Sequence, residues 1–308
     1  MKKLLLSIMF AVCISATAQT TEMIVTFTPG GANDTFARAT QQYLREQIGT
    51  NSVITNRPGA EGRIGVKYAA QKSADGNSLL VISTGTFLFS RVLYRNLDYN
   101  IHDFDTVVPI VTTPIAISVS GASSIMTFQD FVTAAKSRPV NCGISNTASM
   151  FTARYLVKQL GLTNLEIIPY KGGGDVVVAL QGNNVECAIE PQFVYRQPHM
   201  DRRIRILATT DNDVESGLGS VALIKNYIPG FVFQTWYGIG ILKNTPDSTK
   251  APVIDALKLI HRDERFKTAM NLANLRVREY TVPGNRFLDA EYQRWDRIRE
   301  ELGIAKTE

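Results

Sequence analysis

The sequence predicts an α/β protein of two lobes, in which two mainly parallel sheets are joined by a two-strand hinge. A strand–helix–strand–helix–strand plan occurs twice along the chain, first between residues 24 and 84 and again between residues 141 and 189. Each such unit favours a parallel sheet with helices on its faces, because a parallel connection has to cross back over the sheet. The length of 308 residues suits two domains.

The first eighteen residues differ from the rest of the chain. Lys2 and Lys3 precede an apolar run from Leu4 to Ser15, and Ala16-Thr17-Ala18 fits the small-residue pattern of a cleavage site. This order is typical of a secretory signal peptide, so we expect residues 1–18 to be removed after Ala18 and the protein to be exported. An uncleaved anchor is the alternative, but the apolar run is shorter than the roughly 20 residues of a spanning helix.

The first unit opens with a β-rich run at residues 24–27 and a small-residue loop, Pro29-Gly30-Gly31-Ala32-Asn33. The helical pattern from Asp34 to Ile48 places apolar residues on one face and ends at Gly49. A strand at 52–55, a shorter helix that ends at Gln71 and a strand at 79–84 complete the unit.

The second unit repeats this order. A strand at 141–145 leads through the loop Asn146-Thr147-Ala148-Ser149 into a helix over 150–160, which ends at Gly161. A strand at 165–170 follows, then Lys171-Gly172-Gly173-Gly174, a helix to Gln181 and a strand at 185–189.

Two extended apolar stretches, at 106–120 and 231–241, are suited to crossing between the lobes. Residues 251–275 and 285–302 have helical periodicity, and we expect both helices to pack on the first lobe. The predicted boundaries are therefore 19–118 and 238–308 for the first lobe and 119–237 for the second.

Removal of the leader leaves two cysteines, Cys142 and Cys187, both in short apolar runs that are typical of strands. An oxidising compartment would allow them to pair. Two buried thiols are the alternative, and sequence spacing does not decide between them.

The strand-to-helix loops are the candidate binding elements, because ligands of parallel sheets bind beyond the carboxyl ends of the strands. Gly30 and Gly31 allow backbone N–H groups to approach a guest directly, and they precede a helix whose first turn carries unpaired donors and the positive dipole end. The loop 146–149 is the equivalent in the second lobe. Each loop alone could be a simple cap or turn; four in matching pairs favour a binding site.

Three charged residues lie at these loops. Asp34 could cap its helix or accept a hydrogen bond from a ligand. Lys171 could be a solvated lysine or a counter-charge that faces the cleft. Glu190 follows the last strand of the second unit, where it could recognise a donor group or pair with Lys171.

No pattern of catalytic residues is present. The three histidines are isolated, and the chain has no Gly-x-Ser-x-Gly elbow, no His-Glu-x-x-His spacing and no Walker motif. The formal net charge of +5 slightly favours anionic small molecules, whereas the dispersed basic residues argue against nucleic-acid binding. We predict a binding protein rather than an enzyme, with no cofactor and no metal.

A series of short motifs is spread over nearly the whole chain after the leader. In chain order they are Phe27-Thr28-Pro29-Gly30-Gly31-Ala32-Asn33-Asp34, Asn56-Arg57-Pro58-Gly59-Ala60-Glu61-Gly62-Arg63-Ile64-Gly65, Ser83-Thr84-Gly85-Thr86, Pro169-Tyr170-Lys171-Gly172-Gly173 and Trp236-Tyr237-Gly238. This ordered series resembles the receptors of tripartite tricarboxylate transporters, the Bug family.

The resemblance implies a type II periplasmic binding-protein fold that clamps a small carboxylate and delivers it, as a monomer, to two membrane subunits of a secondary transporter. A periplasmic sensor that presents its ligand to a signalling system is the alternative, and an enzyme that acts on an anionic substrate is the third. The predicted ligand-binding residues are Gly30, Gly31, Ala32, Asp34, Ser83, Thr84, Gly85, Thr86, Ser145, Asn146, Thr147, Ala148, Ser149, Lys171, Gly172 and Glu190.

One motif departs from the family. The loop at 146–150 is usually glycine-rich and slightly longer, and a histidine commonly follows it where this chain has Phe151 or Thr152. The departure bears on the ligand more than on the fold, because a bulkier loop would shrink the pocket or admit a different guest.

Overall fold

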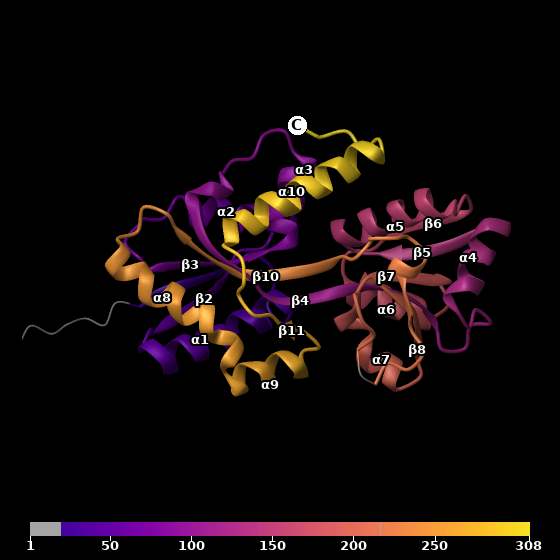
Figure 1. Ribbon diagram of the computed structural model, residues 1–308, viewed down its shortest axis with the longest axis horizontal. Helices are drawn as coiled ribbons and strands as arrows, with labels where there is room; N and C mark the ends of the chain where they lie inside the picture. Colours follow the sequence, from indigo (N-terminus) through magenta and orange to yellow (C-terminus); the bar gives the residue numbers. More distant parts are fainter. Residues whose placement is uncertain (1–19, 216) are drawn as a thin grey trace, which may run out of the picture.

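The computed structural model describes residues 20–215 and 217–308, and the predicted signal peptide lies outside these residues. Two sheets stand side by side along the long axis of the molecule, joined by two extended strands (Figure 1). The predicted two-lobed α/β fold with a two-strand hinge is confirmed.

The sheet of the first lobe has the strand order β2-β1-β3-β10-β4. Strands β1, β2 and β3 are parallel, and β10 runs antiparallel to both β3 and β4. The strand bounds are Thr21–Val25 for β1, Ser52–Asn56 for β2, Ser78–Ser83 for β3, Phe104–Ser120 for β4 and Gln234–Leu242 for β10; the short β11, Arg276–Val277, pairs with β4.

Helices cover both faces of this sheet (Figure 1). On one face α1 packs with α8 and α9, and buried side chains such as Phe36, Tyr43 and Phe266 fill the layer. On the other face lie α2, α3 and α10. The bounds are Ala32–Ile48 for α1, Arg63–Ala70 for α2, Ser90–Leu93 for α3, Asp247–Leu259 for α8, Glu264–Leu272 for α9 and Gly284–Glu301 for α10. A single π-helical turn, Thr84–Phe89, joins β3 to α3 and carries the label η2 here.

In the second lobe β5, β6 and β7 are parallel, and β4 runs antiparallel to β7 and β8. The bounds are Val140–Ile144 for β5, Leu165–Pro169 for β6, Cys187–Pro191 for β7, Ile204–Thr209 for β8 and Ala222–Leu223 for β9. The helices of this lobe are α4 (Phe128–Ser137), α5 (Thr147–Leu160), α6 (Gly173–Gln181) and α7 (Arg196–Met200).

Strand β4 belongs to both sheets, and this sets the direction of every strand end. Residues 104–114 of β4 pair with β10 in the first lobe, and residues 115–120 pair with β7 and β8 in the second. Since β4 leaves the first lobe and enters the second, its antiparallel neighbour β7 runs toward the hinge, as do β5 and β6. Antiparallel pairing of Ser83 with Tyr237 of β10 likewise directs β1–β3 toward the second lobe. The carboxyl ends of both parallel sheets therefore face one gap.

Several elements differ from the sequence prediction. The single helix expected over 251–275 is broken, because the Asp263 side chain accepts a hydrogen bond from the Phe266 N–H at 2.7 Å and begins a new helix there. The last strand of the second unit lies at 187–191 rather than 185–189. Helix α5 begins at Thr147, three residues earlier than predicted. Strand β8 and helix α4 were not predicted.

Cys142 and Cys187 form a disulfide between the neighbouring strands β5 and β7, where the two residues are directly opposite each other. The buried-thiol alternative is therefore wrong. Among residues 20–215 and 217–308, no helix has the length and apolar character needed to span a membrane.

Candidate functional site

Loops of the two lobes meet at the gap. The Thr147 hydroxyl at the start of α5 donates to the Glu61 carboxylate of the first lobe at 3.0 Å. A Cβ on neighbouring Gly62 would lie 2.4 Å from the Thr86 side chain and 3.1 Å from that of Thr26. The loops that follow β1, β2 and β3 are thus packed together in the first lobe, and the loop that follows β5 touches them from the second.

The loop before α1 leaves the first helical turn open. Gly31 is the N-cap residue, and no side chain caps the helix. Gly30 and Gly31 are both exposed, and Gly30 has a φ of 84°, which favours glycine. The Ala32 and Asn33 N–H groups at this terminus are available to an anion, because the first turn of a helix has no internal acceptors for them.

Asp34 is not the N-cap but the third residue of α1. Its carboxylate turns back to accept a hydrogen bond from Gly30 N–H at 3.1 Å, and it pairs with Arg38 at 2.9 Å and Asn56 at 3.2 Å. Burial raises the pKa of Asp34, but the hydrogen bonds from Arg38, Gly30 and Asn56 outweigh it and hold the pKa below its ordinary value. Asp34 therefore fixes the loop and is largely occupied.

The segment after β3 forms a reciprocal cap. Ser83 N–H donates to the Thr86 hydroxyl at 3.1 Å, and Thr84 Oγ1 accepts from Trp236 N–H at 2.7 Å. These hydroxyls have partners within the fold, so this segment contributes mainly shape, with half-exposed Gly85 at its surface.

The loop before α5 is built differently from the loop before α1. The Asn146 side chain caps α5 by accepting from Ser149 N–H at 3.0 Å. Glu190, which is 1% exposed, accepts from the Ser145 hydroxyl at 2.8 Å, from the Asn146 side-chain amide at 2.9 Å and from the Ser145 backbone N–H. The Ser145 and Asn146 donors of this loop are thus already bonded to an internal carboxylate.

Burial raises the pKa of Glu190 to about 7, against the hydrogen bonds from Ser145, Ser149 and Asn146, which lower it. Lys171 is exposed and is not among the partners of Glu190, so the predicted pairing is not formed. Gly172 stands at the N-cap position of α6 without a side-chain cap, and a Cβ on Gly173 would lie 3.4 Å from the Glu190 carboxylate.

Sequence reasoning left three residues of the gap out of the predicted site. They are Thr26, Glu61 and Gly62. The Thr26 hydroxyl is buried and has no hydrogen-bond partner within the described part of the chain. The motif from Asn56 to Gly65 was the signal that could have indicated Glu61 and Gly62, since it follows the strand next to β1.

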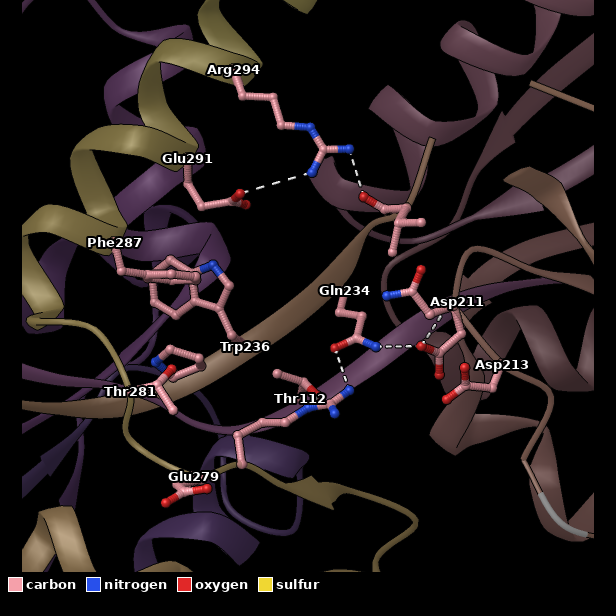
Figure 2. A pocket seen from close by; sticks show the side chains of 14 residues that line it. Thr112, Asp211, Asp213, Gln234, Trp236, Glu279, Thr281, Phe287, Glu291 and Arg294 are labelled. Carbon is pink, nitrogen blue, oxygen red and sulfur yellow. Dashed lines mark hydrogen bonds and ion pairs between the residues drawn. The ribbon is translucent and has the colours of Figure 1, made fainter. Parts of the chain in front are cut away.

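A cavity of about 430 Å³ lies elsewhere, beside the crossing of β4 and β10 (Figure 2). Its walls come from α10, from the loop after β8 and from the segment after β11. None of the predicted site residues lines it. The lining residues are Pro109, Thr112, Asp211, Asn212, Asp213, Val232, Gln234, Trp236, Arg278, Glu279, Thr281, Phe287, Glu291 and Arg294.

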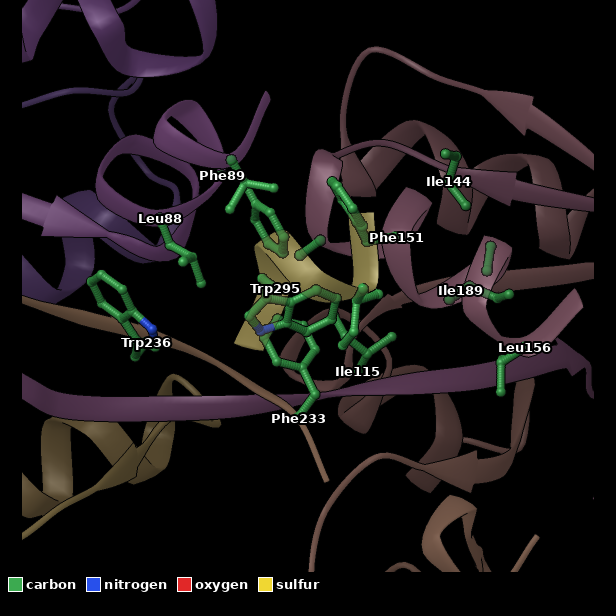
Figure 3. Close-up of a cluster of buried hydrophobic side chains, with 14 of the residues drawn as sticks. Leu88, Phe89, Ile115, Ile144, Phe151, Leu156, Ile189, Phe233, Trp236 and Trp295 are labelled. Atoms are coloured by element: carbon green, nitrogen blue, oxygen red, sulfur yellow. The ribbon is translucent and has the colours of Figure 1, made fainter. Parts of the chain in front are cut away.

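An aromatic cluster holds the two lobes together beside this crossing (Figure 3). Phe89 of η2 stacks on Phe151 of α5 with ring centroids 4.9 Å apart. Trp295 of α10 packs edge-on against Phe89, Phe151 and Phe233 at 5.1, 5.7 and 4.4 Å. Because these rings come from both lobes, the hydrophobic core continues through the hinge.

The chain has recognisable relatives. The family model of the tripartite tricarboxylate transporter family receptor matches residues 36–304. A UPF0065 protein from the tcbD-tcbE intergenic region of Pseudomonas sp. (strain P51) is 32% identical over 232 residues, which is 73% of this chain and 68% of that protein. Protein BugT of Bordetella pertussis is 26% identical over 302 residues, which is 93% of this chain and 90% of BugT.

Solved structures share the fold. R. palustris Rpa4515 with adipate superposes with a TM-score of 0.83 at 24% identity, over 94% of this chain and 98% of that one. The periplasmic binding protein BugD gives a TM-score of 0.80 at 24% identity, over 94% of this chain and 99% of BugD. Since the family model covers most of the chain, we conclude that this protein belongs to the receptor family of the tripartite tricarboxylate transporters, whose members are solute-binding receptors and not enzymes.

Proposed function

We propose that this chain is a periplasmic solute-binding receptor that captures a small carboxylate in the gap between its lobes. As a monomer, it delivers that ligand to the membrane subunits of a tripartite secondary transporter. The predicted signal peptide would bring it to the periplasm. Two structurally similar proteins have been solved with small dicarboxylates: Rpa4515 with adipate, and MatC of Rhodopseudomonas palustris, at a TM-score of 0.77, with bound malate.

The observation that carries the proposal is the uncapped start of α1. Gly31 exposes backbone N–H groups toward the gap, and no side chain occupies them. A carboxylate at this position gains two or more charge-assisted hydrogen bonds and the favourable end of the helix dipole. Each hydrogen bond to a charged group contributes about 1.5–3 kcal/mol, enough for micromolar affinity when several act together.

Lobe closure follows from the same geometry. The α1 loop belongs to the first lobe and the α5 loop to the second, and Thr147 already reaches Glu61 across the gap. A ligand that touches both loops has more contacts when the lobes are together, so it shifts the population toward the closed form. That closed form is what the membrane subunits would recognise.

A two-part experiment tests the proposal. The purified mature chain is titrated calorimetrically with malate, succinate, adipate and their monoamide or monomethyl derivatives. Uptake of the binding acid is then compared between a strain that lacks the gene and its complemented parent. We expect one or more acids to bind and to be recovered unchanged, and uptake to fall in the deletion strain. Failure of every acid to bind would overturn carboxylate capture; binding with undiminished uptake would overturn delivery alone.

A further inference from the structure

The cavity at the strand crossing is separate from the proposed carboxylate site and is lined by both lobes. Asn212 and Asp213 belong to the loop that follows β8 in the second lobe, whereas Phe287, Glu291 and Arg294 lie on α10. Its volume of about 430 Å³ would hold a molecule of amino-acid size. Figure 2 shows Glu291 and Arg294 of α10 at the upper left and Gln234 of β10 near the middle of the lining residues.

Two donor groups line this cavity, one without an acceptor and one whose hydrogen bonds go to neutral oxygens. Trp236 is 1% exposed, and its indole Nε1 has no hydrogen-bond partner in residues 20–215 and 217–308. Within the described part of the chain, the Arg278 guanidinium donates to two neutral oxygens, Thr112 Oγ1 at 2.8 Å and Gln234 Oε1 at 2.7 Å. A buried N–H group without an acceptor is costly, so Trp236 favours an acceptor oxygen in the cavity. Arg278 favours an anionic one, because a guanidinium binds a carboxylate more strongly than it binds neutral oxygens.

One acceptor at the same cavity is also short of a partner. The side chain of Glu291 is 17% exposed, and its nearest cation, Arg294, is 3.9 Å away and already donates to Val232 O at 2.5 Å. Burial raises the pKa of Glu291 above its ordinary value, because it outweighs the lowering by the Arg294 charge and by the Trp295 indole. Asp211, in contrast, has several partners: it pairs with Arg276 and accepts from Gln234 at 2.5 Å.

We propose that this hinge cavity is a second binding site, and that its ligand is a small zwitterion with a carboxylate at one end and an ammonium group at the other. The carboxylate would accept from Trp236 Nε1 and Arg278, and the ammonium group would donate to Glu291, with Asp213 at the rim. A dicarboxylate would place its second carboxylate against Glu291 and Asp213, which would repel it. A diamine would leave the Trp236 and Arg278 donors without an acceptor.

Occupation of this cavity is linked to the carboxylate site through Trp236. Its backbone N–H donates to Thr84 Oγ1 at 2.7 Å, and Thr84 opens the segment that lines the gap. Helix α10 belongs to the first lobe and the loop after β8 to the second. A ligand that contacts both therefore has more contacts in one arrangement of the lobes than in another. Binding at the hinge cavity would then alter the affinity of the first site for the carboxylate. By linkage, the bound carboxylate would alter the affinity of the hinge cavity for the zwitterion by the same factor.

The test is a calorimetric titration at pH 8, because the pKa of Glu291 is raised and an alkaline pH favours its ionised form. The probes are β-alanine, 4-aminobutyrate and 5-aminopentanoate. Succinate and 1,4-diaminobutane are the controls, because their chains are of similar length but carry two negative or two positive charges. Glu291→Gln is compared with Glu279→Gln, the same substitution at a rim carboxylate that is 67% exposed. We expect at least one amino acid of the series to bind, with affinity reduced tenfold or more by Glu291→Gln and less than twofold by Glu279→Gln.

Trp236→Phe provides a second variant that keeps an aromatic ring against Phe287 and removes only the Nε1–H donor. We expect it to weaken the same amino acid about tenfold, and melting curves check that both variants remain folded. The proposal is overturned if no amino acid of the series binds. It is also overturned if Glu291→Gln and Trp236→Phe both leave the affinity for the amino acid unchanged, since the amino acid would then bind at the first site. A third contradicting result is that succinate or 1,4-diaminobutane binds as tightly as the amino acid and loses affinity in Glu291→Gln to the same extent.

Discussion

The loops before α1 and before α5 occupy equivalent positions in the two lobes, yet their polar groups are used in opposite ways. Gly31 leaves the first turn of α1 without a side-chain cap, whereas Asn146 caps α5 at 3.0 Å. A buried carboxylate, Glu190, takes the Ser145 and Asn146 donors of the second loop. The contrast indicates that, of these two loops, the one before α1 supplies free anion-binding donors and the one before α5 supplies a pre-formed wall.

The second lobe is also the more tightly tied of the two. Its disulfide joins β5 to β7 directly behind the α5 loop, because Cys142 lies on the strand that leads into this loop and Cys187 on the strand that leads to Glu190. No disulfide joins strands of the first lobe in the described residues. A cross-linked surface on the second lobe lowers the entropic cost of ligand binding, because it is already ordered before the lobes close on the ligand.

The largest expected effect tests this rigidity. Replacement of both Cys142 and Cys187 by Ala should lower the free energy of unfolding by about 4 kcal/mol, because the cross-link closes a loop of 45 residues in the unfolded chain. Urea unfolding of the variant and the oxidised protein measures the difference. A loss below about 1 kcal/mol would show that the second lobe does not depend on this tie.

A second effect comes from the charge of Glu190. Burial raises its pKa from the ordinary 4.5 to about 7, so the folded state retains a proton that the unfolded state releases between these values. Stability should therefore decrease as pH rises from about 4.5 to 7, by roughly 3 kcal/mol at most, and remain at the lower level above pH 7.

Glu190→Gln removes the titration and keeps a side chain of the same size. Its unfolding free energy should lose this part of the pH dependence while other groups continue to titrate. Parallel urea titrations of the two proteins at pH 4.5, 6 and 8 would show it as a gain in the variant's stability relative to the unmodified protein, which grows to roughly 3 kcal/mol toward high pH. Identical slopes would mean that Glu190 is ionised throughout, with compensation that the present contacts do not include.

The fold could be predicted from the sequence to a large extent, and the reasons are local. Helix periodicity and the stops at Gly49 and Gly161 are encoded within a few residues, and both glycines do take the left-handed conformation. The repeated strand–loop–helix order then predicts parallel sheets, whose strand ends must lie together.

Contacts between distant residues could not be predicted. Glu190 is 45 residues from Ser145, and Thr147 is 86 residues from Glu61. The sequence predicted that Glu190 lies at a strand end that faces the gap, but it did not identify the hydrogen-bond donors to its carboxylate. Many donors could reach that carboxylate until the packing of the strands is known. The hinge cavity is likewise formed by segments that only the fold brings together, such as the loop at Asp211 and the helix that contains Glu291.

The smallest effect compares the two caps directly. Asn146→Ala should cost about 1 kcal/mol of stability, because it removes the side-chain acceptor of α5 and a donor to Glu190. Gly31→Ala should change stability by only a few tenths of a kcal/mol, since Gly31 provides no side-chain cap and an added Cβ would lie 3.8 Å from its nearest neighbour, Thr28 O. Equal costs in thermal unfolding would contradict the contrast between the loops.

The central claim is that the start of α1 binds the ligand's carboxylate, and Gly31→Val tests it most directly. A Cβ at Gly31 would lie 3.8 Å from its nearest neighbour, Thr28 O, so the backbone accepts a side chain there, and we expect the valine methyl groups to hinder the approach of a ligand to the N–H groups of the first turn. Gly174→Val, at an open position in the first turn of α6, is the matched control. Calorimetric titration with the acid that binds the unmodified protein should show an affinity at least tenfold weaker for Gly31→Val and within twofold for Gly174→Val. An unchanged affinity in Gly31→Val would contradict the account.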